Sequence, residues 1–148
     1  MSGVIDTNLL LYAANKACRE HGRAANFLAQ AGRSAGKWYL TEGIVYEFFR
    51  VSTHPRVFDR PLSPEQALAF MRPFWEAESF AFLSLQEDHW ELLEKEILAL
   101  GHASGNLYFD IRTVVLMREH GIRTVYTADA DFLQFKDIDV KNPITEED

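Results

Sequence analysis

Residues 1–13 have the sequence MSGVIDTNLLLYA, in which a carboxylate and an amide separate two apolar runs. The apolar residues before Asp6 predict a short buried strand. Those from residue 9 onward predict a helix that begins directly after it, with Thr7 or Asn8 as its N-terminal cap. A carboxylate at the carboxyl end of a parallel strand lies where open α/β sheets bind ligands. Asp6 is therefore either a ligand-binding residue or only part of the helix cap, and this stretch alone favours neither.

The length and composition predict a single domain covering residues 1–148. The chain has 148 residues, of which 47% are hydrophobic and 25% charged, as in ordinary globular proteins, so we expect disorder only in the last few residues. No apolar run approaches the roughly 20 residues of a membrane span, and Asp6 interrupts the place where a signal peptide carries its apolar stretch. We therefore expect a cytoplasmic protein that does not enter a membrane. The single cysteine, Cys18, lacks a disulfide or metal-binding partner and is expected to be buried or half-buried.

The charges are divided unevenly along the chain. The formal net charge of −7 argues against a protein that binds nucleic acid over its whole surface. Residues 16–60, however, carry eight Lys or Arg and four acidic residues, whereas residues 61–148 carry seven bases and seventeen acids. The first part of the chain can therefore bind a polyanion, and an ordinary solvated surface is the alternative.

Short apolar runs alternate with longer stretches of helical periodicity, and no repeat or linker divides the chain. Strands are predicted at residues 3–5, 37–40, 80–83, 123–126 and 138–140. Helices are predicted at residues 9–15, 20–31, 42–53, 63–77, 87–100, 106–120 and 128–135. Strands separated by helices form parallel βαβ units. The sequence therefore predicts a three-layer α/β/α fold with a central parallel sheet of about five strands.

Local signals refine the predicted helices. Residues 87–100 are strongly amphipathic and end at a glycine, and their buried face is expected to consist of Trp90, Leu93, Ile97 and Leu100. Pro73 is expected to kink or divide the helix in which it lies. The residues expected to cap the other helices are Thr41, Ser63 and Asn106.

Four acidic residues are embedded in apolar sequence, where an unpaired charge is costly. Asp6 and Asp129 follow predicted strands, while Glu47 and Asp110 lie inside predicted helices. An arginine partner or a helix cap is the usual explanation for any one of them. Because the carboxyl ends of parallel strands meet at one edge of the sheet, we expect Asp6 and Asp129 to lie close together there. The other two acids lie on helices that pass the same edge.

Such a cluster of like charges calls for a cation that neutralises it. Oxygen ligands without Cys or His favour Mg²⁺ or Mn²⁺. Acid clusters of this kind support phosphodiester cleavage by a water molecule that the metal activates, and they need no Ser, Cys or His nucleophile. The four acids are therefore candidate catalytic and metal-binding residues.

Four segments follow one another along nearly the whole chain: VIDTNLLLYA, EFFRVSTHPRVF, LYFDIRTVVLMREHGI and YTADADF. In this order and at this spacing they resemble the PIN-domain family, and especially the VapC-type ribonuclease toxins of prokaryotic toxin–antitoxin systems. The resemblance implies a PIN-like fold and an Mg²⁺- or Mn²⁺-dependent endoribonuclease that cuts single-stranded regions of structured RNA. It also implies an antitoxin protein as a partner.

The resemblance assigns roles to individual residues as well. The acidic quartet of the family falls on Asp6, Glu47, Asp110 and Asp129. Asp131 is then an auxiliary acid or a structural cap. The small polar residues that orient the acids and a metal-bound water are Thr7 or Asn8, together with Thr127.

Basic residues near the acids are candidate contacts for RNA phosphates. Arg50, His54 and Arg56 are either such contacts or a helix stop with solvated arginines. Many family members have small residues after the third acid, whereas an arginine, Arg112, stands two residues after Asp110 here. Arg112 is expected either to contact phosphate or to pair with a neighbouring acid.

Other classes of protein fit the acids less well. A phosphatase of the haloacid-dehalogenase type needs a second Asp where Asn8 stands, and a receiver-type domain needs an acid after the strand at residues 80–83, where FAFLSLQ has none. A non-catalytic PIN-like module that binds RNA or protein is the second hypothesis. A DNA nuclease of the same fold is a further variant, because an acid cluster alone does not recognise the 2′-hydroxyl.

The chain is rich in aromatic residues, and we expect them in the core or in a subunit interface rather than stacked on bases. Phe132 and Phe135 are expected to hold the last helix against the sheet. The apolar content favours a homodimer or an antitoxin-binding surface. The remaining aromatic residues to which this expectation applies are Phe48, Phe49, Phe70, Phe74 and Trp75.

Overall fold

The structure is a computed structural model and describes residues 1–145. Its centre is a sheet of five parallel strands in the order β3-β2-β1-β4-β5. The strands are β1 (Gly3–Ile5), β2 (Trp38–Thr41), β3 (Phe80–Leu83), β4 (Thr124–Tyr126) and β5 (Asp139–Lys141). The predicted parallel sheet is therefore confirmed, with strand ends displaced by a residue at most. The predicted disorder of the chain end concerns residues 146–148, outside the described residues.

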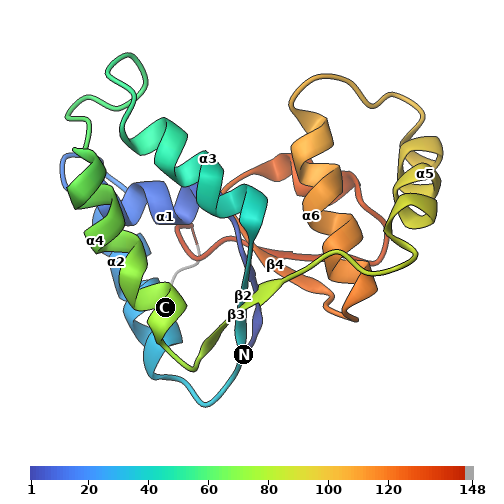
Figure 1. Ribbon diagram of the computed structural model, residues 1–148, viewed down its shortest axis with the longest axis horizontal. Coiled ribbons are helices and arrows are strands. Elements are labelled where there is room, and N and C mark those ends of the chain that lie inside the picture. The colour runs from blue at the N-terminus through green and yellow to red at the C-terminus, as the bar shows by residue number, and fades with distance from the viewer. Residues whose placement is uncertain (146–148) are drawn as a thin grey trace.

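Helices cover both faces of the sheet, as the predicted three-layer fold requires. In Figure 1, α1 to α4 lie on one side of the strands, and α5 and α6 lie on the other. Helix α1 packs on α2 and α3, and α5 packs on α6. The helices are α1 (Thr7–Ala14), α2 (His21–Arg33), α3 (Glu42–Ser52), α4 (Pro64–Glu76), α5 (His89–Leu100) and α6 (Leu107–Glu119), followed by the 3₁₀ helix η1 (Ala130–Gln134).

Helix caps agree with the sequence at two helices and differ at two others. Thr41 Oγ1 accepts a hydrogen bond from Ile44 N, and Ser63 forms a capping box with Gln66. Helix α1, however, is capped by Asp6 instead of Thr7 or Asn8, because the helix already begins at Thr7 while Asp6 keeps an extended backbone. Asn106 precedes α6 with a helical backbone, so its side chain makes no capping bond.

Helix α4 continues through Pro73 as far as Glu76, so this proline does not divide the helix, and the predicted alternative, a kink, stays a prediction. The proline lies in the last turn, where only one intrahelical hydrogen bond is lost.

The core lies between the sheet and its two helical layers. Trp38 on β2 packs edge-on against Phe27 of α2, and Phe48 of α3 is fully buried and stacks on Phe70 of α4. Phe132 and Phe135 are buried as expected. Trp75, by contrast, is exposed on α4 and does not belong to the core.

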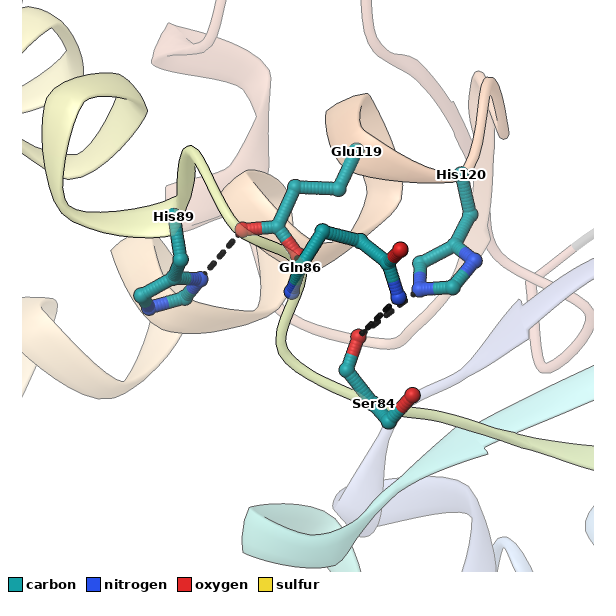
Figure 2. Close-up of polar contacts among 5 residues, drawn as sticks. All are labelled: Ser84, Gln86, His89, Glu119 and His120. Carbon is teal, nitrogen blue, oxygen red and sulfur yellow. Dashed lines mark hydrogen bonds and ion pairs between the residues drawn. The ribbon is translucent and has the colours of Figure 1, made fainter.

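Helix α5 packs through three of the four residues of its predicted face, and the prediction is wrong for the fourth, Trp90. Leu93, Ile97 and Leu100 pack against the core, but Trp90 is 67% exposed. The buried residue of the first turn is His89, whose Nδ1 pairs with Glu119 of α6, as Figure 2 shows. A buried polar pair, which a hydrophobic pattern does not show, therefore lies in the first turn where the pattern placed Trp90.

The segment before α5 is attached to the end of α6 by further polar contacts (Figure 2). Gln86 N donates to Glu119 Oε2 over 3.2 Å. Gln86 Nε2 and His120 Nε2 both donate to Ser84 O, over 3.2 and 2.9 Å.

None of the helices within residues 1–145 is long and apolar enough to span a membrane. Cys18 is half-buried, as expected.

Candidate active site

Two carboxylates lie at the carboxyl ends of neighbouring strands. Strand β1 pairs with β4 through Ile5 and Tyr126, and Asp6 N donates a hydrogen bond to Tyr126 O over 2.9 Å. Asp6 and Asp129 follow these strands, so the sheet brings the two acids to one edge as the sequence predicts.

Asp6 is buried, and its two carboxylate oxygens accept three hydrogen bonds. Oδ1 accepts from Thr7 N over 2.9 Å. Oδ2 accepts from Thr127 Oγ1 over 2.8 Å and from Asn8 Nδ2 over 3.3 Å. Asp6 therefore caps α1 and lies in the acid cluster at the same time. The helix-cap interpretation is confirmed, while ligand binding by Asp6 stays a prediction.

Asn8 and Thr127 connect the start of α1 with the loop after β4. Asn8 Nδ2 donates to Thr127 Oγ1 over 3.0 Å, and Asn8 Oδ1 accepts from Ala128 N over 3.1 Å. Thr127 Oγ1 also accepts from Asp129 N over 3.0 Å. These bonds fix the relative positions of Asp6 and Asp129.

The other two acids of the quartet come from helices on opposite sides of the sheet. Glu47 lies on α3, and its Oε2 accepts from Thr7 Oγ1 over 3.4 Å. Asp110 lies in the first turn of α6. Together with Asp6 they line a small cavity of about 20 Å³, room for one water molecule.

Asp131 lies closer to the cluster than an auxiliary role alone suggests. Carboxylate oxygens of Asp110, Asp129 and Asp131 all lie within 4.8 Å of one another, which is a spacing that a single bound cation can bridge. Asp129 Oδ1 also accepts from Asp131 N over 2.9 Å, which caps η1. The cap of η1 is therefore Asp129 and not Asp131, and the role of Asp131 as an auxiliary acid stays a prediction.

Burial and mutual repulsion make ionisation of this cluster costly. The pKa of Asp110 is raised to about 7, first by burial and then by the charges of the four other acids. The pKa of Asp6 is raised to about 6, mainly by burial. Hydrogen bonds from Thr127 and Thr7 oppose that second rise, while the charges of Glu47 and Asp129 add to it.

The residues present fit a divalent cation bound through oxygen. The donors are carboxylates with neither Cys nor His among them, which suits Mg²⁺ or Mn²⁺. Among residues 1–145, no lysine or arginine lies within 4.0 Å of a carboxylate of the cluster. Within these residues the acids have no cationic side chain as an ion-pair partner, which is compatible with a divalent cation as their counter-charge.

Arg112 lies at the wall of the cluster without pairing with an acid. It lines the same cavity as Asp6, Glu47 and Asp110. Its guanidinium lies against the bare backbone of Gly43 on α3, where a Cβ would come within 2.6 Å of Arg112 Nη1. Of the two roles predicted for Arg112, the ion pair is absent from residues 1–145, so the guanidinium remains available to another anion.

A wider cleft of about 670 Å³ opens from the acids to the surface. Its walls come from α3, from the first turns of α6 and from the loop after β4, and Arg50 contributes to it. His54 and Arg56 line neither this cleft nor the small cavity. His54 Nδ1 instead accepts from Arg56 N over 3.1 Å, which fits the helix-stop interpretation of these two residues.

Two cleft residues were missed by the sequence reasoning. Tyr46 and Phe109 line the cleft with exposed rings. Each directly precedes an acid of the quartet, Glu47 or Asp110. That repeated aromatic-acid pair is the signal that could have identified them.

Another groove, of about 690 Å³, lies between α1 and α4 and is lined mainly by apolar side chains such as Ala13, Leu62 and Phe70. Among residues 1–145, the titratable side chains that line it are Lys16 and Arg60, both basic. This groove therefore differs in charge from the acidic cleft.

Residues 3–139 match the family model of the PIN domain, and the chain belongs to the PIN-domain family. Its curated relatives include Ribonuclease VapC48 of Mycobacterium tuberculosis, 28% identical over 145 residues that cover 98% of this chain and 99% of that protein. Ribonuclease VapC24 of the same organism is 32% identical over 146 residues, covering 95% and 96%.

Solved structures share the fold at lower identity. VapC20 of Mycobacterium tuberculosis, described as a sarcin–ricin loop cleaving toxin, has a TM-score of 0.67 at 16% identity, covering 94% of this chain and 99% of that one. VapBC2 from Rickettsia felis, bound to a promoter DNA fragment, has a TM-score of 0.66 at 17% identity, covering 96% and 98%. The predicted PIN-like fold and the resemblance to VapC proteins are thereby confirmed.

Proposed function

We propose that this protein is an Mg²⁺- or Mn²⁺-dependent endoribonuclease that cleaves phosphodiester bonds in structured RNA as the toxin of a type II toxin–antitoxin pair. The observation that carries the chemistry is the convergence of Asp110, Asp129 and Asp131 within 4.8 Å, beside the buried Asp6 and the half-buried Glu47. Clusters of carboxylates without a neutralising side chain suit metal-assisted phosphodiester hydrolysis.

In this proposal, Asp6, Glu47, Asp110 and Asp129 are the catalytic and metal-holding acids, and Asp131 assists them. Mg²⁺ or Mn²⁺, when bound, supplies positive charge to the phosphodiester and lowers the pKa of water. The remaining polar residues orient the acids: Thr7, Asn8 and Thr127.

Two arginines of the cleft are proposed to hold the RNA backbone. Arg112 stands beside the acids with its guanidinium unpaired by any acid of residues 1–145, and Arg50 is exposed on the rim. A guanidinium binds phosphate through two parallel hydrogen bonds. The cationic groups can therefore orient the strand while the acids act on one phosphate.

The choice of RNA and of an antitoxin partner is supported by the relatives. VapC48 and VapC24 are named ribonucleases, VapC20 is described as a toxin that cleaves the sarcin–ricin loop, and VapBC2 is a toxin–antitoxin structure. We extend these properties to this chain as a cytoplasmic toxin. A homodimer is proposed as well, supported by large apolar side chains exposed away from the cleft, such as Leu98 of α5 and Leu133 of η1.

The test is cleavage of a structured-RNA pool by the purified protein with Mg²⁺, with Mn²⁺ and with EDTA. We expect metal-dependent cutting that Asp6→Asn abolishes and that Asp59→Asn, at an exposed acid outside the cleft, leaves unchanged. Calorimetry with Mg²⁺ and Mn²⁺ measures metal binding separately.

Absence of both cutting and metal binding would identify a non-catalytic PIN-like binding module. Equal cutting of single-stranded DNA would assign the protein to the DNA nucleases, and undiminished cutting by Asp6→Asn would refute the assigned acids.

A further inference from the structure

Two aromatic side chains stand at the mouth of the acidic cleft. Tyr46 is 69% exposed on α3, and Phe109 is 60% exposed on α6. Both line the cleft that contains Asp110, Asp129 and Asp131. They come from helices on opposite sides of the sheet (Figure 1), so the elements that position Glu47 and Asp110 also bring one ring each to the rim.

These rings are not part of the core. Phe48, two residues beyond Tyr46, is fully buried and stacks on Phe70, whereas neither Tyr46 nor Phe109 contacts another aromatic ring within residues 1–145. A large apolar side chain gains free energy when it leaves water. Both rings therefore have free faces that a ligand can cover.

The surroundings of the rings indicate the chemistry of that ligand. Arg50 follows Tyr46 by one helical turn, Arg112 follows Phe109 by three residues, and both arginines line the same cleft. A ligand that covers both rings and pairs with both arginines carries flat apolar groups and negative charges in alternation. Single-stranded RNA has this pattern, with a base and a phosphate in every nucleotide. An apolar protein surface would leave the two guanidinium groups without partners.

We propose that Tyr46 and Phe109 form a nucleobase-stacking subsite that holds unpaired bases beside the acid cluster, an inference that rests on the proposed ribonuclease function for the identity of its ligand. The cleft of about 670 Å³ has the size of an ordinary small-ligand site. Stacking tolerates every base, because each has a π-face. The subsite therefore selects unpaired over paired RNA and imposes little base sequence.

The test compares ring removal with ring retention. Tyr46→Leu and Phe109→Leu keep an apolar side chain but remove the π-face, whereas Tyr46→Phe and Phe109→Tyr keep the ring. Trp90→Leu is the matched control at an exposed aromatic residue outside the cleft. Circular dichroism melting establishes that each variant is folded.

The probes are a single-stranded oligoadenylate containing 2-aminopurine and an abasic ribose-phosphate oligomer of the same length. Both are titrated with Ca²⁺ in place of Mg²⁺ to keep the RNA intact. We expect each Leu variant to raise the Kd for oligoadenylate about tenfold and to lose quenching of 2-aminopurine fluorescence. The ring-retaining variants and Trp90→Leu should bind like the wild type, and no variant should change the Kd for the abasic oligomer.

Unchanged binding of oligoadenylate by both Leu variants would overturn the subsite, and so would a wild-type protein that does not bind oligoadenylate. Light scattering gives a third test, because a wild-type dimer that becomes monomeric in the Leu variants would make these rings an interface between two copies of the chain.

Failure of the subsite and failure of the proposed function give different results. If both Leu variants cleave RNA in a metal-dependent way with an unchanged KM, the stacking subsite is refuted and the nuclease function is supported. If 2-aminopurine quenching depends on the rings but the protein does not cleave RNA, the nuclease function is refuted and the stacking subsite is supported.

Discussion

Thr127 shows how one hydroxyl can serve the acid cluster without belonging to it. Its Oγ1 donates to Asp6 and accepts from Asn8 and from Asp129 N. The hydroxyl is therefore shared among the end of β1, the start of α1 and the loop after β4. Removing it disturbs the orientation of Asp6 while leaving every acid in the sequence.

Thr127→Val keeps the volume of the side chain but removes this hydroxyl. We expect RNA cleavage and Mg²⁺ affinity to fall about 10- to 100-fold, the usual effect of losing a group that orients a metal ligand. Thr127→Ser, which retains the hydroxyl, should stay near the wild type. Cleavage rates and Mg²⁺ calorimetry on the three proteins measure the difference. If the valine and serine variants behave alike, the hydroxyl does not orient Asp6.

The contact between the Arg112 side chain of α6 and the backbone of α3 depends on a missing side chain. Gly43 lies in the first turn of α3, and the Arg112 guanidinium rests on its backbone. Arg112 itself lines both the small cavity and the wider cleft. The sequence showed Arg112 as a departure from the family pattern, but it did not show that a glycine some 70 residues earlier makes room for it.

Gly43→Ala is expected to displace the Arg112 guanidinium, because the new Cβ would lie 2.6 Å from Nη1. The arginine is flexible, so the fold should persist, and alanine favours the helix by up to about 1 kcal/mol. We expect a raised KM for RNA with an unchanged or higher melting temperature, and Arg112→Ala should raise KM in the same direction. The control is Gly22→Ala on α2, where a Cβ meets nothing within 4 Å. If Gly43→Ala and Gly22→Ala have equal KM values for RNA, Arg112 does not contribute to substrate binding.

Helix α5 is attached to α6 by a buried polar pair far from the chemistry. Glu119 has a fully buried side chain that pairs with His89 Nδ1 and accepts from Gln86 N. Glu119→Ala would leave the buried His89 Nδ1 without an acceptor, whereas Gln86 is exposed and its N–H can bond to water. We expect a loss of about 3 kcal/mol in the free energy of unfolding, measured by urea denaturation. Metal affinity and cleavage per folded molecule should be retained, with the exposed Glu87→Ala as control. A loss of metal affinity in Glu119→Ala would mean that α5 supports the site.

At the scale of the whole molecule, the sequence predicts the sheet and the edge at which the acids meet. Strands such as residues 3–5 and 80–83 are short apolar runs. They can be identified because they alternate along the sequence with longer stretches of helical periodicity. Asp6 and Asp129 could be placed together because parallel strands share an edge. The pairing of the strand backbones determines the sheet and the edge where the acids meet. The order of strands and helices along the sequence is enough to predict this pairing.

Features that depend on side chains from distant elements could not be predicted in this way. The first turn of α5 buries His89 and leaves Trp90 exposed, and the partner of His89 is Glu119, thirty residues away along the chain. The membership of Asp131 in the cluster follows from how η1 turns after Asp129. The rings of Tyr46 and Phe109 lie at the cleft because two separate helices face the same edge of the sheet. For His89 and for the two rings, the partner is far away in the sequence, whereas Asp131 depends on a local turn that the pattern does not show.

The whole molecule is expected to be less stable, without metal, as the pH rises. The pKa values of Asp6 and Asp110 rise from 3.8 to about 6 and about 7 in the folded protein. Between about pH 4 and pH 7 the folded state thus binds protons that the unfolded state has released. The contribution of these groups to the free energy of unfolding decreases across that interval and reaches its lowest value above pH 7. In EDTA, the melting temperature should therefore fall from pH 5 to pH 8.

Mg²⁺ should reverse this loss at pH 8, because it binds the ionised carboxylates of the folded state only, and it should have little effect at pH 5. Differential scanning calorimetry at both pH values, with Mg²⁺ or with EDTA, measures the two effects. Asp110→Asn removes one of the perturbed groups and should weaken both the fall and its reversal. Asp59→Asn removes the same formal charge at an exposed position and controls for the net charge of −7. If the two variants lose stability with pH to the same extent, then general charge repulsion causes the fall, and the acid cluster does not.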